Sequence, residues 1–213
     1  GADLVNKDHP QVVEIWNLVF IQYNRKKDGS LIKLDKQYVD TGMGLERLCM
    51  ALQKKESTYD TDLFEDIIKK IEDISNKKYL SGDENIDVAI RVISDHIRAL
   101  IFTISDGQIP SNNGPGYVIR RILRRAVRYG YTNLDIKTPF IYELVDIVIS
   151  KYLTIYPDLE NQSKYISSLI HEEEKGFLKT LNQGLSLINQ IIESNPNDKK
   201  ISGEDSFKLY DTY

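Results

Sequence analysis

The sequence has little sulfur and no long apolar run. Cys49 is the only cysteine among 213 residues, which excludes an internal disulfide and a cysteine zinc cluster. The three histidines, His9, His96 and His171, are scattered without metal-ligand spacing, so no metal site is expected. No stretch approaches the roughly 20 apolar residues of a membrane helix, and the first residues show neither a signal core nor an arginine-rich transit pattern. These absences favour a cytoplasmic protein with no membrane partner.

The composition is that of a globular chain. Hydrophobic residues make up 41% and charged residues 28% of the sequence, and the formal net charge is -4. A chain of this length forms one large domain or two small ones. The negative balance argues against a general nucleic-acid coat, although the basic residues are locally concentrated.

The first quarter of the chain has strand character. Residues 11–23 are rich in β-branched and aromatic side chains and predict a long strand. Both alternating faces are largely apolar, which favours a central position in a sheet, with Trp16 filling the core opposite Asn17. A turn at 26–30 and a short strand at 31–34 could pair back. After a turn broken by glycines, leucines at helical spacing predict a helix.

The remainder of the chain shows helical periodicity. Apolar stripes and loop signals predict helices over about 63–71, 93–104, 117–129, 140–152 and 159–192. The predicted fold is therefore mainly α, with a short antiparallel β segment before a helical domain. The change from strand to helix places the domain boundary between 1–56 and 57–213.

The segment VDTGMGLERL, residues 39–48, combines groups that could bind a nucleotide and an amine. Gly42 and Gly44 would let the backbone approach a ligand closely. Asp40 could meet a cationic amine, and Arg47 offers a fork of donors for phosphate. Short glycine patterns are weak signals, so an ordinary strand–turn–helix joint with a surface arginine stays open from these residues alone.

An arginine-rich helix is the second candidate site. Four arginines fall at positions i, i+3, i+4 and i+7 on one predicted face: Arg121, Arg124, Arg125 and Arg128. A fifth, Arg120, lies at the border of this face. Apolar residues share that spacing on the opposite face. Arginine favours bidentate contacts with phosphate, so the face predicts a cradle for RNA phosphates. The alternative is a solvated face paired with the acidic run 172–174.

Several segments together carry a family resemblance. GMGLERL closely resembles motif 3 of the class II aminoacyl-tRNA synthetases. The surrounding segments resemble the alanyl-tRNA synthetases in particular, in collinear order over essentially the whole chain: EIWNLVFIQYNR, YDTDLF, DHIRALIFTISDG, GYVIRRILRRAVRYG, HEEEKGFLKTL and LYDTY. The resemblance implies the end of a class II catalytic sheet followed by a helical domain that binds the tRNA acceptor stem. It also implies ATP-dependent activation of alanine and its transfer to tRNA(Ala).

The resemblance assigns roles to the residues around motif 3. Arg47 would contact ATP and stabilise charge on its phosphates, and Asp40 would hold the amino group of alanine. Gly42 would line the same pocket through its backbone, and Asn17 and Val19 match strand residues of the alanine site. ATP and Mg²⁺ would be the substrate and cofactor of the parent enzyme; a magnesium contact from the glutamate at position 14 is a weaker transfer.

The resemblance also assigns the reading of tRNA. The family identifies its tRNA through a G·U pair in the acceptor stem, and the positions that match its contacts are Asn112 and Asp211. Asn113 competes with Asn112 for this role. The arginine face would supply the phosphate contacts.

The catalytic machinery implied by the family is incomplete in these residues. Motifs 1 and 2 precede motif 3 in class II enzymes, and neither is found before it here. The chain by itself is therefore expected to be inactive in alanine activation and to need the remainder of the same polypeptide. Two alternatives are a non-catalytic RNA-binding helical module and a structural or dimerisation fragment; Asp40 and Arg47 favour the enzyme, because a pure RNA-binding module does not need them.

Overall fold

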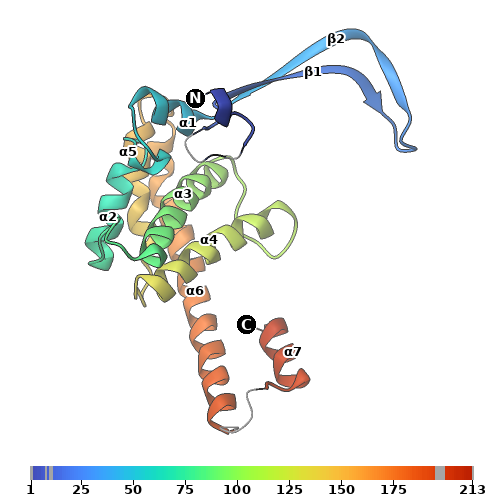
Figure 1. Ribbon diagram of the computed structural model, residues 1–213. Helices are drawn as coiled ribbons and strands as arrows, with labels where there is room; N and C mark the ends of the chain where they lie inside the picture. The colour runs from blue at the N-terminus through green and yellow to red at the C-terminus, as the bar shows by residue number, and fades with distance from the viewer. Residues whose placement is uncertain (1, 8, 10–11, 195–199, 213) are drawn as a thin grey trace. The chain divides into compact units, whose positions relative to one another are not determined.

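The computed structural model describes residues 2–7, 9, 12–194 and 200–212 (Figure 1). It divides into two compact units, Gly1–Glu65 and Asp66–Tyr213. Helices predominate, and a two-stranded antiparallel sheet is the β structure of the described part. The predicted fold class, mainly α with a short antiparallel β segment, is confirmed. Within the described residues no helix is both long and apolar enough to cross a membrane.

A long hairpin dominates the first unit. Strand β1 (Trp16–Arg25) pairs antiparallel with β2 (Leu31–Met43). At the tip, Asp28 Oδ1 accepts a hydrogen bond of 2.9 Å from Ser30 N, which closes the turn between the strands. A 3₁₀ turn, η1 (Ala2–Leu4), precedes the hairpin, and α1 (Leu45–Leu52) and η2 (Thr58–Asp60) follow it.

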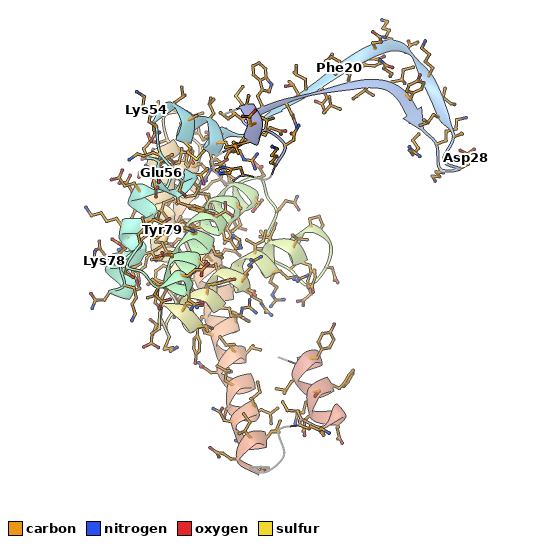
Figure 2. The ribbon with its side chains drawn as sticks, in the orientation of Figure 1. Phe20, Asp28, Lys54, Glu56, Lys78 and Tyr79 are labelled. Atoms are coloured by element: carbon orange, nitrogen blue, oxygen red, sulfur yellow. The ribbon has the colours of Figure 1, made fainter. Side chains whose placement is uncertain are left out.

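The hairpin corrects three expectations about the strands. β2 is much longer than the predicted 31–34, so Asp40 and Gly42 lie inside a paired strand and Gly44 alone marks the turn, as N-cap of α1. In the described part of the chain β1 pairs with β2 alone, so it is not a central strand. Trp16 is 60% exposed and fills no core. Side chains stand out on both faces of the hairpin (Figure 2), and Phe20 is 70% exposed.

The rest of the chain is helical. Its elements are α2 (Glu65–Ser75), α3 (Glu84–Ser105), α4 (Gly114–Asn133), the 3₁₀ turn η3 (Ile141–Leu144), α5 (Val145–Tyr152), α6 (Leu159–Ser194) and α7 (Gly203–Thr212). The predicted helices are all present, with shifted ends. The segment 140–152 begins with a 3₁₀ turn, and the sequence pattern did not indicate α7.

The core of the second unit is built on α3. Asp83 caps its start by accepting a hydrogen bond from Asn85 N at 2.9 Å. Its packing is mainly against α4, and it also contacts α5 and α6. Fully burying one such aliphatic side chain contributes about 1.5–3 kcal/mol. The apolar stripe of α3 is almost completely buried: Ile90, Ile93, Ile97, Leu100, Ile101 and Ile104.

A buried carboxylate connects α6 to the segment before α5. Glu174 is fully buried, and its Oε1 accepts hydrogen bonds from the backbone N–H groups of Phe140 at 2.8 Å and Ile141 at 3.1 Å. No side chain of η3 caps its own first turn, so Glu174 satisfies donors that would otherwise be buried without a partner. The pKa of this carboxyl is raised from 4.5 to about 7, mainly by burial and also by nearby Glu143, while the backbone donors oppose the rise.

We predict that Glu174 makes stability depend on pH. Because its folded pKa lies above the unfolded value, the folded chain holds more protons between pH 4.5 and about 7. The stability it contributes is therefore fully present below pH 4.5 and is lost as pH rises through about 7. A shift of this size corresponds to a stability change on the order of 3 kcal/mol. Urea denaturation of Glu174→Gln should lack this part of the pH dependence.

Glu193→Gln is the matched control, because Glu193 is an exposed glutamate on the same helix. Its unfolding free energy should follow the wild-type pH dependence. Parallel curves for wild type and Glu174→Gln between pH 4.5 and 7.5 would contradict the assignment.

Candidate functional site

Four of the predicted substrate-binding residues meet on one face of the hairpin. In the register of β1 and β2, Asn17 lies opposite Gly42 and Val19 lies opposite Asp40. Side chains two residues apart on a strand share a face, and so do directly opposed residues. The pairing therefore brings Asn17 and Val19 together with Asp40 and Gly42, although the two pairs lie more than 20 positions apart in the sequence.

Some of the polar atoms on this face already accept hydrogen bonds, and others are available to a ligand. Asn17 Oδ1 accepts a hydrogen bond of 3.1 Å from Gly42 N, and a Cβ at position 42 would lie 3.3 Å from that oxygen. One Asp40 oxygen accepts from Thr41 N at 2.8 Å. Asp40 makes no ion pair with another described residue, and it is exposed. Its second oxygen can therefore receive an amine.

Arg47 is fixed to the chain just before β1. Its Nη1 donates to the backbone carbonyl of Glu14 at 2.9 Å, and Gly44 N donates to Ile15 O at 3.0 Å. These bonds tie the first turn of α1 to the base of the hairpin. An arginine has five N–H donors, so the others remain available to a phosphate. The Glu14 carboxylate is exposed, and the described residues include no group of three metal-ligating side chains.

The opposite face of the hairpin contains a contact that the sequence did not indicate. Trp16 Nε1 donates to the Thr41 hydroxyl, which in turn donates to the carbonyl of Asn17 at 2.8 Å. Thr41 thus joins the two strands beside the residues of the candidate site. Cross-strand neighbours such as these contribute to hairpin stability. The sequence indicates this contact only by a tryptophan and a threonine that would lie on the same face once the two strands pair.

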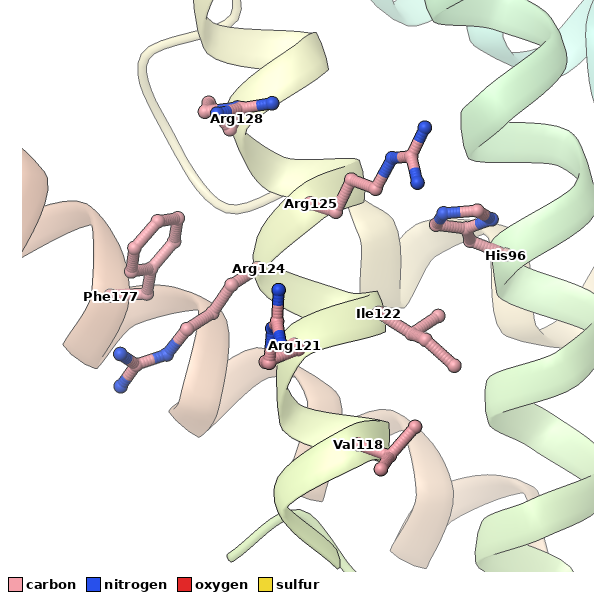
Figure 3. A pocket seen from close by; sticks show the side chains of 8 residues that line it. All are labelled: His96, Val118, Arg121, Ile122, Arg124, Arg125, Arg128 and Phe177. Atoms are coloured by element: carbon pink, nitrogen blue, oxygen red, sulfur yellow. The ribbon is translucent and has the colours of Figure 1, made fainter. Parts of the chain in front are cut away.

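In the second unit, three of the arginines of α4 are available to a ligand. Arg121, Arg125 and Arg128 make no ion pair within the described part of the chain. They line a cleft of about 590 Å³ together with His96 of α3. Figure 3 shows Arg125 extending toward His96. This cleft therefore presents unneutralised guanidinium groups that can receive phosphates.

The other two arginines are held by α6. Glu173 Oε1 accepts from Arg120 Nε at 2.6 Å and from Arg124 Nε at 3.0 Å. The Arg124 guanidinium also lies 5.0 Å from the centre of the Phe177 ring. The predicted phosphate ligands thus differ in their partners: Arg124 lines the cleft while it is paired with Glu173, and Arg121, Arg125 and Arg128 line it without an ion pair in the described part of the chain. In the acidic run 172–174, Glu172 is exposed, Glu173 is half-buried and Glu174 is buried.

The loop before α4 places Asn112 next to an arginine. The helix begins at Gly114, three residues before the predicted start, so Asn113 is its N-cap residue, although without a side-chain cap bond. Asn112 is exposed, and its Oδ1 accepts a hydrogen bond from Arg120 Nη1. A Cβ at Gly116 would lie 2.3 Å from the carbonyl of Ile109, so only glycine fits this close turn. Position 211 falls within α7, but its side chain lies outside the described residues.

Comparison with known proteins matches the chain to one family throughout. The family model described as "tRNA synthetases class II (A)" matches residues 2–213. The chain is similar to proteins named alanine–tRNA ligase: it is 54% identical to that of Christiangramia forsetii over 213 residues, 55% identical to that of Parabacteroides distasonis over 215, and 51% identical to that of Porphyromonas gingivalis over 215. Each alignment covers 100% of this chain and 24% of the relative. The chain thus spans about a quarter of the length of these relatives.

Proposed function

The chain belongs to the class II (A) family of tRNA synthetases, and on this premise we propose that it is part of an alanine–tRNA ligase. Its hairpin would carry part of the alanine and ATP site, and its helices would bind the acceptor stem of tRNA(Ala). The observation that carries the proposal is the cross-strand grouping of Asn17, Val19, Asp40 and Gly42, with Arg47 at the first turn of α1. We expect such an enzyme in the cytoplasm, with the tRNA that it charges.

The proposed reaction needs binding groups rather than a nucleophile on the protein. The alanine carboxylate attacks the α-phosphate of ATP in line, which forms alanyl-adenylate and releases pyrophosphate; the alanyl group then passes to the 3′ end of the tRNA. Asp40 would hold the alanine amine, and Asn17, Val19 and the backbone of Gly42 would line its pocket. Arg47 would neutralise charge on ATP, which enters with Mg²⁺. Positioning and charge stabilisation account for much of the rate of such reactions.

The exposed hairpin supports a need for more polypeptide. Both of its faces carry exposed apolar side chains, among them Leu18, Val19, Phe20 and Val39. Exposed apolar surface of this extent is a typical contact surface, and the relatives are about four times as long as this chain. We propose that residues 1–56 complete a catalytic domain with the remainder of the same polypeptide, and that 57–213 form the tRNA-recognition domain.

We predict that the 213-residue chain alone does not catalyse alanine-dependent exchange of pyrophosphate into ATP. Addition of the missing polypeptide of a relative should restore exchange. In that assembly Arg47→Ala should lower the exchange rate by about 10²–10³-fold, as for loss of one preorganised donor to a transition state. Arg25→Ala, at the end of β1, is the control and should leave the rate unchanged. Robust exchange by the chain alone would refute the need for a partner segment.

The cleft along α4, which His96 of α3 and Phe177 of α6 also line, supports the proposed acceptor-stem contact. Arg121, Arg125 and Arg128 would bind phosphates of the stem, and Arg124 would contribute while anchored to α6. Such contacts fix an RNA helix without reading its sequence. The edges that can be read lie in the shallow minor groove, where Asn112 and Asp211 would contact the G·U pair. Because Oδ1 of Asn112 is already bonded to Arg120, its amide N–H₂ is the group that faces outward.

Loss of a phosphate ligand should weaken binding to all acceptor stems alike. Arg125→Ala is predicted to lower the affinity for G·U and G·C minihelices by about tenfold and to reduce the slope of log K against log[salt] by about one. Fluorescence anisotropy at several salt concentrations measures both. Lys69→Ala, which removes an exposed cation on α2, is the control. An unchanged salt slope for Arg125→Ala would remove Arg125 from the phosphate contacts.

Loss of a base contact should instead change specificity. Asp211→Asn is predicted to erode the preference for G·U over G·C by about tenfold, within the 1–3 kcal/mol scale of a groove contact. The affinity for the G·C stem should change little. Glu204→Gln, which removes an exposed charge near the start of α7, is the control. If the ratio of the two affinities is the same in Asp211→Asn and wild type, Asp211 does not read the pair.

A further inference from the structure

Three segments of the helical unit are joined through one arginine. Arg120 of α4 donates from Nε to Glu173 of α6 at 2.6 Å, and from Nη1 to Oδ1 of Asn112 in the loop before α4. The Glu173 and Arg120 side chains are only 18% and 24% exposed. The contact therefore connects a shielded ion pair to an exposed amide, across 53 residues of sequence between Arg120 and Glu173.

The chemistry of arginine fixes which atom of the Asn112 amide faces Arg120. A guanidinium only donates hydrogen bonds, so the atom of Asn112 that faces Arg120 must be the carbonyl oxygen. With that oxygen held, the plane of the amide is set and its N–H₂ points away. Glu173 holds Arg120 from the other end with a charge-assisted bond, which is stronger than a neutral one. An exposed asparagine without such a partner would sample both orientations of its amide.

We propose that Glu173 and Arg120 are positioning residues that orient Asn112 for RNA recognition. This inference rests on the proposed function, because it takes Asn112 as a reader of the acceptor stem. Glu173 touches no RNA in this arrangement; it acts through Arg120. The same glutamate also binds Arg124, so it holds the phosphate-binding helix and the reading loop in one register.

An alternative for Glu173 is a purely structural ion pair between α4 and α6. The two roles differ in what they change. A structural pair affects stability and the affinity for every stem. A positioning pair affects the ratio of affinities for G·U and G·C stems, and it does so only while Asn112 is present.

The test is a double-mutant cycle on that ratio. Glu173→Gln keeps the shape of the side chain and removes its charge; it should lower the G·U preference of the chain about three- to tenfold. In the Asn112→Ala background the same change should have no further effect on the ratio, because coupled residues act as one unit. Glu172→Gln makes the same charge change at an exposed neighbour and should leave the ratio as in wild type.

A second measurement follows the amide itself. In the free chain the side-chain N–H₂ signals of Asn112 in an ¹⁵N-labelled sample should be two separate, well-dispersed peaks. They should move toward those of a free asparagine in Glu173→Gln. If Glu173→Gln does not fold, Arg120→Lys, which keeps the charge and loses the fork, should give the same change in both readouts.

The outcomes separate the two proposals. If Asn112→Ala erodes discrimination and Glu173→Gln and Arg120→Lys do not, the positioning role is wrong and the RNA-reading role stands. If Glu173→Gln lowers the ratio equally with and without Asn112, it does not act through that residue. If Asn112→Ala leaves discrimination unchanged, or the chain binds no stem, the reading role fails, and the orienting role fails with it.

Discussion

One turn of α6 holds the helical unit together through two adjacent glutamates. Glu174 points into the core and accepts the backbone donors at the start of η3, while Glu173 points to α4 and accepts from two of its arginines. A buried carboxylate is costly unless its hydrogen bonds are satisfied, so the segment at Phe140 and Ile141 and the turn of α6 must form together. The same turn also holds α4 through Arg120 and Arg124, in addition to the packing of α4 against α3.

The arginines of α4 divide between contacts with α6 and a surface without ion pairs in the described part of the chain. A net charge of -4 gives little indication of an RNA-binding surface, and five arginines on a single helix repel one another unless some are neutralised. Glu173 neutralises Arg120 and Arg124 on the side of α6. Arg121, Arg125 and Arg128, which make no ion pair in the described part of the chain, line the cleft with His96 of α3 and Phe177 of α6. This separation concentrates positive potential at one place on an acidic protein.

The hairpin imposes a different constraint, which is register. A shift of one residue between β1 and β2 would move Asp40 and Gly42 to the face that carries Trp16. The Trp16–Thr41 contact on that face and the Asn17–Gly42 contact on the other both fit the observed register alone. Specific polar pairs thus fix the register of a hairpin whose apolar side chains are exposed on both faces.

The sequence by itself determined the helices other than α7, the presence of the hairpin and the family, because periodic apolar stripes, turn residues and motif 3 are local patterns. The stripe of α3 predicted its buried face correctly, since a helical period depends on neighbours within a few residues. Local patterns failed at Trp16 and at the length of β2. A tryptophan among apolar residues looks the same whether or not other chain covers it, and a glycine in a paired strand looks like one in a turn.

Only the tertiary structure decided which arginines are free and how Asn112 is oriented. These outcomes depend on Glu173, which lies about 50 residues further along the chain, and on the packing of α4 against α6. The grouping of Asn17 and Val19 with Asp40 and Gly42 likewise depends on strand pairing across the turn. Charge and hydrogen-bond partners are chosen by distance in space, and sequence spacing fixes that distance only within a single helix or strand.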